Sequence, residues 1–170
     1  KFKWSATDAN EDELTYSLYV RKDGWKSWVR LDDSLAKGEY EWDTTTTPAG
    51  QYQVKVVASD RKDNAAAETL EGERLSAPFA VAHVPPTVTV KVVGVEGDQA
   101  IVEATATDPL VRLTAASFAV NGKKWVNVFP SDGLFDGRTE TFQFKTEALK
   151  PGTHVLVLKV KDAAGNVGAG

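Results

Sequence analysis

The chain has 170 residues, 42% of them apolar, a formal net charge of −4 at pH 7, and no cysteine or methionine. This composition supports a buried core and excludes disulfides, thiolate nucleophiles and cysteine-ligated metals. The sequence has no clustered Lys/Arg patch of the kind that binds nucleic acid. It also has no stretch near the roughly 20 apolar residues of a membrane-spanning helix.

Apolar residues alternate with other residues along the first half of the chain, which predicts half-buried β-strands. The turn signals "KDG" at 22–24 and "PAG" at 48–50 separate these strands. A further strand is predicted in "APFAVAHV" at 77–84. The positions predicted to face the core are Phe2, Trp4, Ala6, Tyr16, Leu18, Val20, Tyr40, Trp42, Tyr52, Val54, Val56 and Ala58.

The second half of the chain continues the same pattern. A strand is predicted over 87–93, and "NGK" at 121–123 and "KPG" at 150–152 mark later turns. No segment has a helical period, so the chain is predicted to be all-β. Its predicted core positions are Val102, Ala104, Ala106, Phe118, Val120, Phe142, Phe144, Leu156, Leu158 and Val160.

The two halves repeat one another. "GQYQVKVVASDRKDN" at 50–64 matches "GTHVLVLKVKDAAGN" at 152–166, and Trp25 aligns with Trp125. The offset between the copies is 100 in the first part and 102 in the last, which indicates a duplication with a two-residue insertion. A repeat of this length, built from short strands, predicts two β-sandwich domains.

The stretches "WSATDANEDELTYSLYV" and "YEWDTTTTPAGQYQVKVVASD" resemble fibronectin type III-like and immunoglobulin-like modules of large bacterial surface or secreted proteins. Trp4 matches the core Trp of strand B in such modules, and Tyr52 matches the Tyr that opens strand F. The second copy departs from this pattern at His154 and Val102. The resemblance implies two tandem Ig-like/fibronectin type III-like β-sandwich domains in an extracellular, cell-surface or periplasmic location.

We predict domains over residues 1–84 and 85–170. The first lacks a strand A and the second lacks a last strand, so the chain is interpreted as a fragment of a longer protein. Open sheet edges pair readily with other strands, and edge-strand pairing with another chain is therefore expected. Pro85 and Pro86 restrict the backbone between the domains, which predicts a semi-rigid joint with the domains end to end.

Acidic loops are the first candidate site. Asp8, Asn10 and Asp12 follow the predicted strand B, and Asp60 and Asn64 follow strand F at the same end of a sandwich. Oxygen ligands of this kind suit calcium, the one cofactor that the sequence suggests. The alternative is turn chemistry, with Asp8 capping a turn and Asn64 in a left-handed conformation.

Aromatic residues form the second candidate. Trp25, Trp28 and Trp125 lie around hairpins, where exposed rings bind sugars or partner proteins. The alternative is that these rings cover the open face of the sandwich. His154 is expected to make a buried hydrogen bond, and His83 lies near the joint in the other predicted domain, which argues against a shared metal site.

No residue pattern indicates catalysis, because the sequence does not suggest a nucleophilic side chain positioned next to a general base. The predicted function is a non-catalytic spacer or adhesive repeat in a larger exported bacterial protein. The alternative is a carbohydrate-binding or accessory module of a secreted hydrolase. Expected partners are neighbouring domains of the parent chain and another protein or a polysaccharide.

Overall fold

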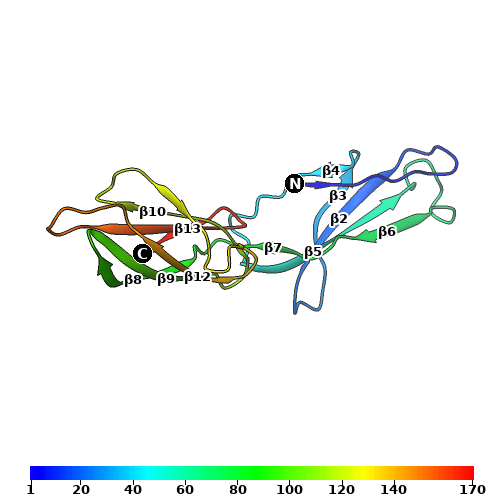
Figure 1. Cartoon of the computed structure of the whole chain (residues 1–170). Helices are drawn as coiled ribbons and strands as arrows, with labels where there is room; N and C mark the ends of the chain where they lie inside the picture. The colour runs from blue at the N-terminus through cyan, green and yellow to red at the C-terminus, as the bar shows by residue number, and fades with distance from the viewer. The chain divides into compact units, whose positions relative to one another are not determined.

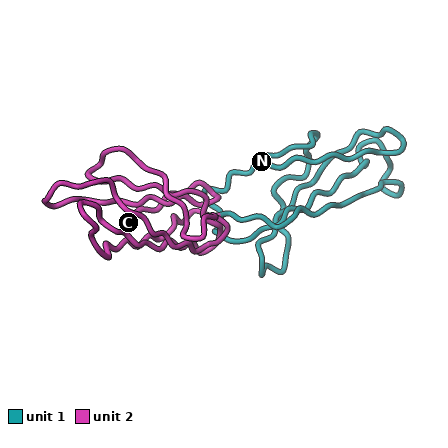
Figure 2. The backbone as a smooth tube through the Cα atoms, viewed as in Figure 1, with its two compact units in different colours: residues 1–81 teal, residues 82–170 magenta.

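The computed structural model describes residues 1–170. It consists of strands, turns and loops that form two compact units, unit 1 from Lys1 to Val81 and unit 2 from Ala82 to Gly170 (Figure 2). The all-β prediction is confirmed, and the units divide slightly before the predicted boundary at residue 84. The structure contains no helix that could span a membrane.

Unit 2 is a sandwich of two antiparallel sheets, one with the strand order β12-β9-β8 and one with the order β11-β10-β13-β14 (Figure 1). This three-plus-four arrangement is fibronectin type III-like. The strands are β8 (Thr87–Glu96), β9 (Gln99–Thr107), β10 (Leu113–Val120), β11 (Val126–Val128), β12 (Thr139–Lys145), β13 (Leu156–Asp162) and β14 (Val167–Ala169).

The core of unit 2 follows the predicted alternation. Val102 on β9, Phe142 on β12 and Leu158 on β13 are almost fully buried. The Phe118 ring stacks on Phe144 with their centroids 4.5 Å apart. Side chains from both sheets therefore meet in one apolar layer, as period-two strands require.

The prediction that unit 2 lacks its last strand is wrong. Val167–Ala169 forms β14 and pairs with β13. Leu158 and Gly170 also exchange backbone hydrogen bonds of 2.9 and 3.1 Å. Gly168 allows this arrangement, because a Cβ there would stand 1.8 Å from the carbonyl oxygen of Pro86.

Unit 1 has a similar plan with a smaller first sheet. That sheet contains only β1 and β4, whereas the second has the order β3-β2-β5-β6 with β7 also paired to β5 (Figure 1). The strands are β1 (Phe2–Lys3), β2 (Thr15–Lys22), β3 (Val29–Leu35), β4 (Glu39–Tyr40), β5 (Gly50–Ser59), β6 (Glu71–Leu75) and β7 (Phe79–Val81).

Tyr52 lies at the centre of the unit 1 core with 1% of its surface exposed. Trp42 and Phe79 pack against its ring, and Leu18 and Val54 complete the buried cluster. The residues predicted to face the core are therefore buried along β2 and at the start of β5.

The prediction fails at the open side of unit 1. Ala6 is exposed, and Val56 and Ala58 are only half-buried. Strand β1 ends at Lys3, so the expected strand from Phe2 to Ala6 is mostly loop. The physical reason is that no strand lies against the outer edge of β1, whereas β8 covers the same edge of β9 in unit 2.

Candidate functional site

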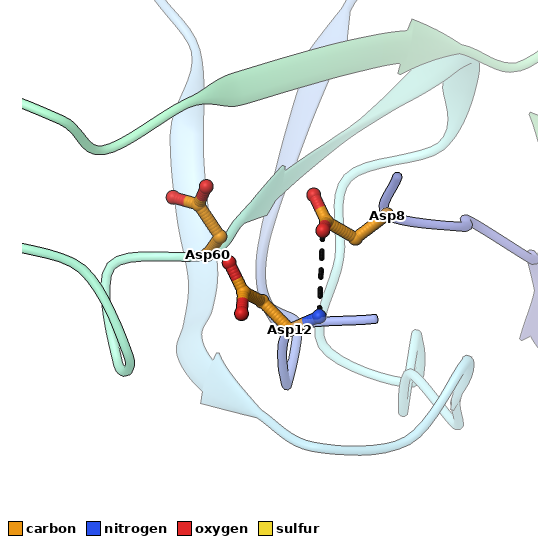
Figure 3. A group of neighbouring side chains, drawn as sticks. All are labelled: Asp8, Asp12 and Asp60. Atoms are coloured by element: carbon orange, nitrogen blue, oxygen red, sulfur yellow. Dashed lines mark hydrogen bonds between the residues drawn. The ribbon is translucent and has the colours of Figure 1, made fainter. Parts of the chain in front are cut away.

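Three carboxylates converge at one end of unit 1. Asp8 and Asp12 lie in the loop between β1 and β2, and Asp60 follows the last residue of β5. One carboxylate oxygen from each residue lies within 4.8 Å of the others (Figure 3). The structure thus brings together side chains that are separated by about fifty residues in the sequence, because the two loops leave the sandwich at the same end.

Backbone donors already use part of this cluster. Asp8 Oδ1 accepts hydrogen bonds from the backbone N–H groups of Asn10 at 2.8 Å and Asp12 at 3.3 Å. Asp60, with 3% of its surface exposed, accepts a 2.8 Å bond from the Leu70 N–H. Asp8 therefore caps a turn, as predicted, and its carboxylate also lies close to those of Asp12 and Asp60.

Asn64 and Asn10 have different roles. The Asn64 side-chain amide donates to Asp12 Oδ2 at 2.8 Å and to the carbonyl oxygen of Asp60 at 3.3 Å. The predicted left-handed backbone at Asn64 is wrong, since Glu11 adopts it instead with φ of 63°. Asn10 is exposed and bonds to Asp8 through its backbone, so it is not one of the converging carboxylate ligands.

Polar contacts tie the two loops together beside the cluster. Asp63 Oδ2 accepts a 2.7 Å bond from the Glu13 N–H. The Glu13 carboxylate in turn pairs with Lys62, and this hydrogen bond raises the pKa of the Lys62 ammonium. The carboxylates are thus held close by contacts on both loops, and their oxygens are ligands of the kind that hard cations such as calcium take.

The duplicated loops of unit 2 provide an internal comparison. Asp108, aligned with Asp8, accepts bonds from the Leu110 and Val111 N–H groups. Asp162 accepts two 2.8 Å bonds from Asn166, one from its backbone and one from its side chain. Arg112 stands at the position aligned with Asp12. Turn chemistry is therefore common to both units, whereas the third carboxylate is specific to unit 1.

The sequence prediction missed a second acidic group, in unit 2. Carboxylate oxygens of Asp132, Asp136 and Glu140 lie within 4.8 Å of one another. Glu140 is 5% exposed, and its Oε1 accepts bonds from the backbone N–H groups of Asp136 and Gly137. The sequence held no signal for this group, because a spacing of four residues brings side chains together on a helix, and these acids lie in loop and strand.

The tryptophan candidates have different surroundings. Trp25 is 40% exposed and meets Tyr52 edge-on at 6.0 Å between centroids. The Arg21 guanidinium lies 4.6 Å from the centre of the half-buried Trp28 ring. Lys159 lies 3.5 Å from the centre of the Trp125 ring, which is 41% exposed. Cations therefore lie against Trp28 and Trp125, and Trp25 has an aromatic neighbour instead.

Trp25 also forms the wall of a pocket of about 540 Å³ in unit 1. The pocket combines aromatic surface with polar side chains that can donate and accept hydrogen bonds. Its lining is Arg21, Asp23, Gly24, Trp25, Gln51, Tyr52, Gln53 and Pro78. A pocket that combines an aromatic ring with a few polar groups has the general make-up of a small-molecule site.

Tyr52 on β5 and His154, which lies two residues before β13, make equivalent contacts in the two units. Tyr52 donates its hydroxyl to the carbonyl oxygen of Pro48 at 2.6 Å, and His154 Nε2 lies 2.7 Å from the carbonyl oxygen of Lys150. Asn121 occupies the other ring nitrogen of His154 at 2.8 Å. Both nitrogens of this half-buried ring are thus engaged in unit 2, where His154 has a structural role.

No family model and no curated protein matches the chain. Among solved structures, it is similar to the chicken CNTN1 FN1–FN3 domains, at 20% identity and a TM-score of 0.42. That match covers 98% of this chain and 59% of the other. By the order of their strands, the two units form a tandem pair of fibronectin type III-like β-sandwich modules.

Proposed function

We propose that this chain is a non-catalytic spacer and interaction module of a larger exported bacterial protein. The observation that supports this proposal is the tandem arrangement of two sandwiches of the same plan in one chain. Modules of this plan are suited to separating or presenting other domains, because their termini and loops lie at the ends of a stiff double layer of sheets.

The short joint supports the spacer role. Only four residues separate Val81, the end of β7, from Pro86. Pro86 is buried, and its carbonyl oxygen lies against Gly168 within unit 2. Pro85 fixes its own φ and restricts the residue before it, so little of the joint is free to flex.

Distance measurements between spin labels test the spacer role. Because the chain contains no cysteine, exposed Lys26 and Lys124 are each replaced by Cys and labelled, one in each unit. A narrow distance distribution is expected. The control is the same pair with a Gly-Ser-Gly-Ser insertion after Val84, which should broaden the distribution. A wild-type distribution as broad as the control's would contradict a stiff joint.

Carbohydrate binding is a second candidate, favoured by the pocket beside Trp25. The exposed ring supplies a stacking surface, and Asp23, Gln51 and Gln53 supply hydrogen-bonding groups around it. The expected result is retention of the chain on an insoluble polysaccharide, lost in Trp25→Ala. Trp125→Ala is the matched control, because that ring is equally exposed. Retention that survives Trp25→Ala would exclude this pocket as the site.

A further inference from the structure

The polar side of the pocket beside Trp25 is the outer face of the sheet that contains β2 and β5. Arg21 of β2 stands directly opposite Gln53 of β5, and both residues alternate with buried core residues. The pairing continues past the end of β2, where the Asp23 N–H donates to the carbonyl oxygen of Gln51 at 2.8 Å. Because two residues of a strand span roughly 7 Å, these two pairs form successive steps of one polar surface.

Arg21 carries the only cationic side chain that lines this pocket. Its guanidinium lies 4.6 Å from the centre of the Trp28 ring. A contact with a ring face uses the charge of the guanidinium and none of its five N–H donors. Arg21 takes part in no ion pair and donates no hydrogen bond within the chain. Its donors are thus held beside the pocket without an acceptor.

Other cations on the same sheet have acidic partners. Arg30 on β3 lies 2.9 Å from Asp33. Lys55 on β5 lies 3.3 Å from the Glu73 carboxylate. The pocket instead presents an unpaired guanidinium at one step and the unpaired carboxylate of Asp23 at the next.

This arrangement fits a sugar ring that carries a carboxylate. A guanidinium binds a carboxylate through two parallel N–H···O bonds. The Trp25 ring is 40% exposed and offers a face on which a sugar ring can stack. The Asp23 carboxylate accepts hydrogen bonds from hydroxyl groups, and the Gln51 amide both donates and accepts them. A phosphate is less favourable than a carboxylate, because Asp23 would repel its higher charge more strongly.

We propose that the pocket beside Trp25 binds an acidic sugar, with its carboxylate on Arg21, its ring against Trp25 and a hydroxyl group donating to Asp23. This inference names the class of ligand for the carbohydrate-binding candidate described above and rests on that candidate. An acidic peptide offers the same carboxylate without hydroxyl groups for Asp23, so the sugar is the more complementary ligand.

Two forms of one glycan test the role of the carboxylate in the intact 170-residue chain. One is an oligomer of galacturonic acid, and the other is its methyl ester, which keeps the rings and hydroxyl groups and removes the charge. Binding is followed by the ¹⁵N NMR signal of the Trp25 indole N–H. The acid should bind about tenfold more tightly than the ester, the effect of one hydrogen bond to a charged group.

Arginine variants show whether the preference for the acid arises at Arg21. Arg21→Gln removes the guanidinium and should make the affinities for the acid and the ester equal. Arg21→Lys keeps the charge without the paired donors, so it should retain part of the preference. Arg30→Gln is the matched control and should preserve the full preference, because Arg30 is an exposed arginine outside the pocket. The backbone amide signals of each variant show whether it is folded.

Four results would overturn the inference. Equal binding of acid and ester by the wild-type chain would exclude a role for the carboxylate. A preference for the acid that survives Arg21→Gln would assign it to general charge attraction. Polyglutamate that displaces the acidic sugar and loses its own affinity in Arg21→Gln would make an acidic peptide the ligand. The fourth is binding of neither glycan at millimolar concentration. In that case, retention on a neutral polysaccharide that depends on Trp25 would leave the carbohydrate-binding candidate standing without the acidic sugar.

Discussion

Replacement of Tyr52 by Phe tests how unit 1 is held together at the start of β5. The hydroxyl donates a 2.6 Å bond to the carbonyl oxygen of Pro48, and the side chain is 1% exposed. A hydrogen bond of this kind contributes about 0.5–1.5 kcal/mol to the free energy of unfolding. Because Pro48 is exposed and water can reach its carbonyl, we expect a loss of about 1 kcal/mol.

Urea unfolding followed by tryptophan fluorescence measures this loss. Four of the five tryptophans lie in unit 1, and a Trp125→Phe background removes the signal of unit 2. With a denaturant slope of about 1–3 kcal/mol per molar urea, the midpoint should fall by roughly 0.3–1 M.

Tyr19→Phe is the control for removing a hydroxyl, because Tyr19 is half-buried on the face of β2 opposite the core residues, beside Lys55. Its midpoint should move little. Equal midpoints for Tyr52→Phe and Tyr19→Phe would show that the bond to Pro48 adds nothing beyond what water supplies, and would refute the reasoning.

Gly168→Ala should destabilise unit 2 by about 1–3 kcal/mol, because the new Cβ would collide with Pro86. Gly94→Ala is the control and should not destabilise unit 2, because the atom nearest to its Cβ is 3.7 Å away. Urea unfolding followed by the tryptophan fluorescence of unit 2 compares the two midpoints. Calcium at ten times its dissociation constant should stabilise unit 1 by about 1.4 kcal/mol, an effect absent in Asp12→Ala. An unchanged melting midpoint would show that the carboxylates cap turns and do not bind calcium. Burial raises the pKa of Tyr52, so the folded state favours the neutral phenol. The stability that this preference contributes is lost as pH rises above about 10. Between pH 9 and 11, Tyr52→Phe should therefore lose less stability than the wild-type chain does.

The sequence predicted the parts of the fold in which a strand has one buried face. Leu18, Val54 and Leu158 lie at the expected phase, because a period of two places alternate side chains on one side of a sheet. The duplication was also predictable, since it repeats whole stretches such as 50–64 and 152–166. These signals are local and do not depend on a neighbouring strand.

The strands that depend on tertiary partners were not predictable. Every residue of β6 (Glu71–Leu75) is exposed, so "EGERL" has no apolar alternation to detect. β14 is held by pairing with β13 and by the close approach of Gly168 to Pro86, neither of which its three residues reveal. Ala6 had the right phase for a strand but lacks a neighbour that would bury it.

The candidate site was predictable in composition and not in geometry. Loop positions placed Asp8, Asp12 and Asp60 at one end of the sandwich, and the structure brings their carboxylates together. The direction of the Asn64 amide, toward Asp12 and the Asp60 carbonyl, depends on side-chain packing between two loops. A single sequence holds no signal for such a choice.

Unit 2 distinguishes the two roles considered for these loops, which are turn formation and calcium binding. Asp162 and Asn166 bond to each other and form a complete turn without any third acid, so an Asp followed by Asn four residues later needs no metal. In unit 1, Asn64 turns instead toward Asp12, and unit 2 has Arg112 at the aligned position. An arginine adds a cation where unit 1 adds an anion. Any affinity of these loops for calcium therefore depends on position 12, and the turn residues alone do not create it.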